Sequence, residues 1–322
     1  MESKVYVRFL FFREWRTYTN SRGYKETCCK GEHVSLWEMK MDPQLDNHYL
    51  RMRYTPSYPQ PVVFYVPDVM HVTDESGLQG IFRDGGFRIA HYGKNNFLWF
   101  SLSVTDNNIA EAEDNFLEDI YPDGWNQEEG FLKDFTTSPA FQSESRYGNF
   151  CFTFSLRELL SHYASQFCYK SAPVFRVLGT KIYKQEIMYS VLVHPRHIGR
   201  YKHYPRLPRG DEEVCGYSQG QMSWSCQAPS GTHYYRFKVN RKEGTVYGSR
   251  LGHQKHYVWD HVTVAFHMEP QWVLRVNRTR LYQTVTVCKV AQVNLLRDPG
   301  AALSKDKAKR ILELLGRNYR LL

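Results

Sequence analysis

Short apolar runs alternate with polar-capped amphipathic stretches between residues 61 and 205, and this alternation constrains the fold more than any other feature. The runs PVVFYV, FLWFSL, FCFTF, PVFRVL and EIMYSVLV are rich in β-branched and aromatic residues, which favour buried strands. Asp74, Asp106 and Ser155, or the threonines before the first two, can begin helices by accepting hydrogen bonds from free N–H groups. The sequence therefore predicts a mixed α+β region around one sheet.

The helices expected after Asp74 and Asp106 are amphipathic. In the first, Leu78, Ile81 and Phe82 share one face, and Gly85-Gly86 should end it because glycine adopts the left-handed conformation readily. In the second, the acids are expected to point outward. Its expected apolar face consists of Ile109, Phe116, Leu117 and Ile120.

The chain is predicted to have three parts. Residues 1–60 form an N-terminal extension that ends in the Pro-rich stretch TPSYPQP, and residues 61–205 form the mixed domain. Residues 206–322 form a β-rich basic domain, closed by a helix that Ser304 begins. Its expected strands are YYRFKV, HYVWDHVTVAFHM, QWVLRV and LYQTVTVCKVAQVNLL.

Composition favours a soluble protein of a reducing compartment. No apolar run reaches the roughly 18 residues of a membrane span, so we expect no membrane association. The seven cysteines are odd in number and irregularly spaced, which favours free thiols over a disulfide framework. These features predict a cytoplasmic or nuclear location.

The positive charge is concentrated in one region. The net charge is +9, and bases predominate from about residue 196 to residue 256, interleaved with tyrosines. Such a segment is suited to bind nucleic acid or another polyanion, although a solvated basic surface without a partner has the same composition.

The sequence lacks the residue spacings that define several common types of site. The cysteines lack the paired CxxC arrangement of structural zinc sites, and no GxxxxGK[ST] phosphate loop or convincing GxGxxG motif is present. No metal site is therefore predicted, and ATP hydrolysis or dinucleotide redox chemistry of the usual kinds is not expected.

Three motifs follow one another in the region 61–205. His71-Val72-Thr73 ends an expected strand and precedes LQGIFRDGGF, a helix and glycine turn. Leu98-Trp99-Phe100-Ser101 and KQEIMYSVLV (184–193) lie in two later strands. A second His-Val-Thr, at 261–263, lies within a strand-like run, where His261 is expected to be a wall or surface residue.

This order resembles the motifs of the poly(ADP-ribose) polymerase-like (diphtheria-toxin-like) ADP-ribosyltransferases. The resemblance implies an ADP-ribosyltransferase-like mixed sheet, NAD as cofactor, and transfer of one ADP-ribose to a protein or nucleic acid acceptor. It also implies a role in innate antiviral defence.

The resemblance assigns roles to individual residues. Glu186 would stabilise the positive charge that develops on the ribose, and His71 would hold the adenosine-side ribose. Trp99 would stack on nicotinamide, and Thr73 and Ser101 would complete the cofactor site. The implied catalytic residues are therefore His71, Trp99 and Glu186.

An alternative is a catalytically inactive module of the same fold that binds nucleic acid or a protein through its basic C-terminal half. Val72 stands where the family has a small residue, and Trp99 where it has tyrosine. Each candidate also has a purely structural explanation. Trp99 can be a core residue, Glu186 a solvent-facing strand start, and His71 an interior histidine with satisfied hydrogen bonds.

Overall fold

The computed structural model describes most of the chain. The described residues are 14–19, 25–45, 62–89, 96–120, 135–137, 144–183, 186–209, 213–227, 229–240, 245–258, 260–291, 296 and 298–320. Side chains are described for these residues except 120, 135–137, 229–240, 245–258 and 299.

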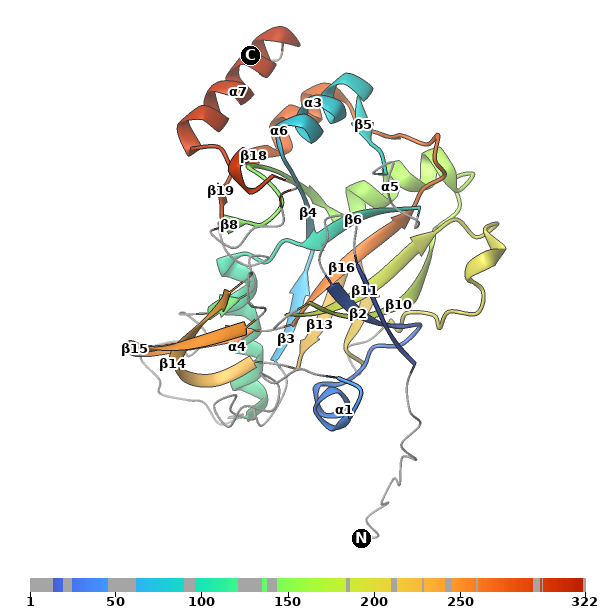
Figure 1. The fold of residues 1–322 in the computed structure, drawn as a ribbon. Coiled ribbons are helices and arrows are strands. Elements are labelled where there is room, and N and C mark those ends of the chain that lie inside the picture. Colours follow the sequence, from blue (N-terminus) through green and yellow to red (C-terminus); the bar gives the residue numbers. More distant parts are fainter. Residues whose placement is uncertain are drawn as a thin grey trace.

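A mixed sheet of nine strands forms the centre of the protein (Figure 1). In spatial order its strands are β1 (Trp15–Thr19), β2 (Lys25–Lys30), β10 (Val174–Tyr183), β11 (Glu186–His194), β16 (Asp260–His267), β6 (Phe97–Leu102), β4 (Asp68–Thr73), β9 (Phe150–Ser155) and β18 (Val285–Val287). Strands β11 and β16 pair in parallel, and the other neighbours are antiparallel. The prediction of an α+β fold around one large sheet is confirmed.

Smaller sheets surround the central one. They are β12 (Cys215–Ser218), β13 (Gln221–Cys226) and β3 (Val62–Val66); β14 (Pro229–Asn240), β15 (Thr245–Val258) and β7 (Phe135–Thr137); β17 (Leu274–Arg275) and β5 (Gly86–Phe87); and β19 (Lys289–Val290) and β8 (Glu144–Ser145).

The helices gather in two places. They are α1 (Leu36–Met41), α3 (Glu75–Asp84), α4 (Asp106–Ile120), α5 (Leu156–Phe167), α6 (Arg278–Thr284) and α7 (Lys305–Asn318), with short 3-10 helices η1 (Gly199–Tyr201) and η2 (Pro299–Ala301). Helices α3, α5, α6 and α7 lie toward one end of the molecule, whereas α1 and α4 lie toward the other (Figure 1). Within the described ranges, no helix has both the length and the apolar composition that crossing a bilayer requires.

Local sequence signals set the helix ends as predicted. The Asp74 and Ser155 side chains accept hydrogen bonds from the backbone N–H groups of Gly77 and Glu158. Ser304 begins α7 in the same way. Gly85 ends α3 in the left-handed conformation, with φ of 66°.

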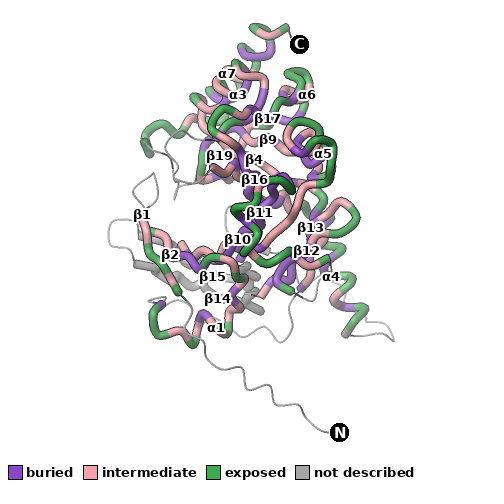
Figure 2. The backbone as a smooth tube through the Cα atoms, turned by 90° about the vertical axis from the view of Figure 1, so that its right-hand side faces the viewer, coloured by how far each residue is buried: buried purple, intermediate pink, exposed green. Residues whose placement is uncertain are grey.

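Phenylalanine side chains fill the space between the central sheet and the helices. Phe100, Phe152 and Phe154 alternate with less buried residues along β6 and β9, and they and Phe266 of β16 are at most 1% exposed. The ring of Phe87 contacts the first three of these, at centroid distances of 5.3–5.8 Å. In Figure 2 the buried residues, in purple, accordingly follow β11 and β16 through the middle of the molecule.

Three local expectations were wrong. Residues 281–284 were expected in a strand, but they complete α6, because the Asn277 side chain caps the Thr279 N–H and starts a helix. In QWVLRV only Leu274–Arg275 form a strand. The acids of α4 do not all point outward, since Glu113 is only 8% exposed.

The central sheet draws strands from all three parts of the sequence. Strands β1 and β2 come from the expected extension, and β16 and β18 come from the expected C-terminal domain. Strand β16 lies between β11 and β6, in the middle of the sheet. The expected boundaries at 60/61 and 205/206 therefore do not coincide with a division of the sheet. The stretch TPSYPQP (55–61) lies outside the described residues.

Candidate functional site

Glu186 begins strand β11 and is bound by an arginine that the sequence analysis did not single out. Arg146 Nη1 donates to Glu186 Oε2 at 2.6 Å, and Arg146 Nη2 donates to Glu186 Oε1, so the pair is bidentate. The side chains are 11% and 10% exposed. The carboxylate is therefore largely withdrawn from solvent and its charge is matched by a guanidinium.

A glycine allows the segment that carries Arg146 to approach strand β4. Gly148 has φ of 144°, and a Cβ at this position would collide with the Thr73 carbonyl group. Strand β8, just before Arg146, pairs with β19. The arginine is therefore held by backbone contacts on both sides of its position.

His261, which was expected to be a wall or surface residue, lies in the sheet beside this ion pair. It is partly buried in strand β16, where it is paired with Met188 of β11. Burial and the positive charge of Arg146 lower the pKa of His261 to about 3. The imidazole is therefore neutral at physiological pH.

Trp99 lies on the same face of the sheet as Glu186. The register places Ser190, Thr263 and Ser101 in one row across β11, β16 and β6, and the first two hydroxyl groups lie 3.3 Å apart. Residues two apart on a strand share a face, so Glu186 and Trp99 both belong to the face of this row. Trp99 is partly exposed.

Lys181 covers the Trp99 ring. Its Nζ atom lies 4.8 Å from the ring centroid, and it also pairs with Glu26 at 3.3 Å. Lys181 belongs to β10, and Trp99 belongs to β6, three strands away in the sheet order.

His71 lies on the opposite face. Its ring contacts Phe87 and Phe100 at centroid distances of 5.2 and 5.4 Å, on the face that the helices cover. Its Nδ1–H donates to the Trp99 carbonyl oxygen at 2.9 Å. Because Trp99 precedes Phe100 on the strand, its side chain points to the other face.

Thr73 shares the His71 face and supports the junction between β4 and α3. A Cβ at Gly77 would collide with the Thr73 hydroxyl group, so the first turn of the helix packs directly on this side chain. The structure thus brings together Trp99, Ser101 and Glu186 on one face, and it separates them from His71 and Thr73.

A buried cysteine and histidine lie close together elsewhere, between β12 and the segment before α1. Cys215 Sγ is 3.4 Å from His33 Nδ1. Burial raises the pKa of Cys215 and lowers the pKa of His33 to about 4, so both groups are neutral. A neutral thiol is a poor nucleophile, which argues against a catalytic role for this pair. In the described part of the chain, no group of three or more His, Cys, Asp or Glu side chains is arranged for a metal ion.

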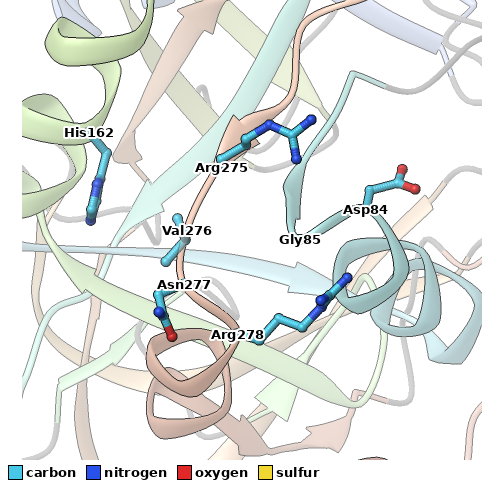
Figure 3. A pocket seen from close by; sticks show the side chains of 7 residues that line it. All are labelled: Asp84, Gly85, His162, Arg275, Val276, Asn277 and Arg278. Atoms are coloured by element: carbon cyan, nitrogen blue, oxygen red, sulfur yellow. The ribbon is translucent and has the colours of Figure 1, made fainter. Parts of the chain in front are cut away.

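A pocket of about 440 Å³ lies where the end of α3 meets α5 and the start of α6 (Figure 3). Arg278 lines it and donates to the carbonyl oxygens of Phe82 at 3.0 Å and Arg83 at 3.2 Å. These carbonyl groups belong to the last turn of α3, so this arginine stabilises a helix end. None of the residues expected in the cofactor site lines this pocket.

The segment 195–209, here named the basic loop, follows β11 and carries five exposed cations. No acidic residue occurs in it. Figure 1 shows the loop, in yellow, beyond the ends of β10 and β11. Its exposed cations are Arg196, Arg200, Lys202, Arg206 and Arg209. Arg200 lies 3.9 Å from Glu269, whereas the other four form no ion pair with any described residue.

Hydrogen bonds to buried groups fix the basic loop at its base. Arg176 donates to His194 Nε2 at 3.0 Å and to the Tyr204 carbonyl oxygen at 2.5 Å. Since the arginine can only donate, His194 must carry its proton on Nδ1, which donates to the Pro195 carbonyl oxygen at 2.8 Å. Burial lowers the pKa of His194 to about 4, which keeps this acceptor available at neutral pH.

The other anchor of the loop is His267. The Tyr201 hydroxyl group lies 2.9 Å from its Nδ1 atom, and Glu269 Oε1 lies 2.9 Å from its Nε2 atom. Tyr201 and Leu207 are buried at 7% and 8% exposure. Tyr201 and Leu207 thus pack against the protein, and the five cations of the loop are exposed to solvent.

Comparisons with known proteins found no relative of this chain. No protein-family model matches the sequence, and no curated protein or solved structure is significantly similar to the chain.

Proposed function

We propose that the protein binds nucleic acid through the basic loop and does not turn over NAD. The observation that carries the proposal is the set of four exposed cations, Arg196, Lys202, Arg206 and Arg209, that no described carboxylate neutralises. Uncompensated positive charges favour binding of a polyanion, because binding releases the counterions condensed on it. Since the segment is anchored, binding does not have to order a mobile chain. The basic strands β14 and β15 belong to the expected polyanion-binding region, but their side chains lie outside the described residues.

The first test is the salt dependence of binding to a labelled oligonucleotide, measured by fluorescence anisotropy. Each phosphate contact contributes a slope of about 0.7 for single strands, so four contacts give a slope of about −3 in log affinity against log salt. Between about 50 and 200 mM salt, the affinity should then fall roughly 50-fold. Binding that is absent at low salt, or that does not change with salt, would contradict the proposal.

The second candidate function is NAD-dependent mono-ADP-ribosyl transfer. One observation favours it, since Trp99, Ser101 and Glu186 share a face of the sheet. Two observations oppose it. Glu186 is paired with Arg146, and His71 lies on the opposite face among phenylalanine rings. A carboxylate already bound to a guanidinium stabilises a developing ribose cation poorly.

An incorporation assay with labelled NAD distinguishes between the two candidate functions. We expect no label to be incorporated into the protein or into an added nucleic acid, because His71 lies on the opposite face of the sheet from Trp99 and Glu186. Glu186→Gln and His71→Ala are the matched variants, and circular dichroism would verify that both are folded. Incorporation by the wild type that falls by two or more orders of magnitude in both variants would overturn this expectation in favour of the transferase.

A further inference from the structure

Tyr169 and Lys170 adopt a backbone conformation that residues with side chains rarely adopt. Their φ values are 50° and 62°, directly after the Cys168 that ends α5. A helix end of this kind usually has glycine, and a bulky aromatic residue in the left-handed region is an outlier. The Tyr169 side chain does not gain from packing in return, because the residue is 85% exposed.

The exposed tyrosine lies beside the basic loop. Its ring contacts the ring of His197, with centroids 5.2 Å apart and planes inclined by 55°. Lys170 and Arg196, the chain neighbours of these two rings, are both exposed cations. An aromatic surface is therefore presented to solvent between positive charges.

We propose that Tyr169 and His197 form a platform on which an unpaired base stacks, so that the basic loop selects single-stranded nucleic acid over duplex. This inference rests on the proposed function. Phosphate contacts from the cations are available to either form of nucleic acid. Only a single strand can turn a base onto an external aromatic ring, since the bases of a duplex are stacked on one another. Strain retained at an exposed position fits a functional role for the ring.

The test compares single-stranded DNA, single-stranded RNA and a duplex, each about 12 nucleotides long, in anisotropy titrations at one salt concentration. Tyr169→Leu should lower the affinity for single strands roughly 10-fold and leave duplex binding unchanged, because stacking on an aromatic ring contributes about this much per base. Tyr169→Phe should bind as the wild type does. A preference between DNA and RNA would identify which single strand uses the platform.

Two further variants test whether the loss of affinity comes from a change in stability or from the loss of any exposed aromatic residue. Tyr169→Asn removes the ring but suits the left-handed backbone, so it should raise or maintain the melting temperature while losing the same affinity. Trp37→Leu removes an aromatic residue that is 62% exposed on α1, and it should have no effect on binding. Equal losses for single strands and duplex in Tyr169→Leu, or no loss for either, would overturn the platform and leave the salt-dependent binding of the basic loop standing.

Discussion

Replacing Arg196, Lys202, Arg206 and Arg209 together by glutamine is expected to lower the affinity for single-stranded nucleic acid about 100-fold at physiological salt. Each cation that contacts a phosphate raises the affinity by a similar factor through counterion release. The four factors multiply to about 100-fold. The slope of log affinity against log salt should fall toward zero in the same variant. Folding should not suffer, because none of the four side chains pairs with a described residue.

The chain offers a control of equal charge. Helix α7 carries Lys305, Lys307, Lys309 and Arg310, all exposed, and their replacement by glutamine removes the same four charges. This control should bind nearly as the wild type does if the basic loop is the site. Equal losses in the two variants would mean that net charge alone attracts the oligonucleotide, and no loss in the loop variant would show that the site lies elsewhere.

Glu186→Ala is expected to lower the free energy of unfolding by about 3–5 kcal/mol. The substitution removes the carboxylate that pairs with Arg146, whose side chain is only 11% exposed. The guanidinium is then left with an unpaired charge that water solvates poorly. Urea unfolding followed by tryptophan fluorescence would measure the change.

The matched control for this ion pair is Glu158→Ala. Glu158 makes the same bidentate contact with Arg280, at 2.7 and 2.6 Å, but this arginine is 43% exposed. An exposed pair contributes about 1 kcal/mol or less, so the control should be close to the wild type. If both variants lost equal stability, burial would not distinguish the two pairs. Replacing Glu186 and Arg146 together by leucine and methionine should recover most of the loss.

The elements of residues 61–205 could be predicted because their signals are local. The cap at Asp74, the left-handed Gly85 and the apolar runs each act within a few residues, and the structure contains the corresponding helix end or strand. Helix α6 was missed because its residues favour strands, and the cap at Asn277 outweighs that weak preference.

The arrangement of the site depends on signals that the sequence does not carry locally. A shift of one residue in the pairing of β4 and β6 would turn His71 toward the other face, and register is set by packing between distant segments. Arg146 lies 40 residues before Glu186 in the chain, and nothing in the sequence near either residue indicates their pairing. The charge of the basic loop was visible in the sequence, but its fixed base on His194 and His267 was not.

The position of β16 determines when this protein can fold during its synthesis. The ribosome produces β6 and β11 long before β16, the strand that lies between them. Until residue 267 has left the exit tunnel, both strands have an open edge with unpaired backbone groups, and such edges are sites of aggregation. We therefore expect a nascent chain without β16 to be prone to aggregation, and a fragment that ends near residue 205 would keep both edges open.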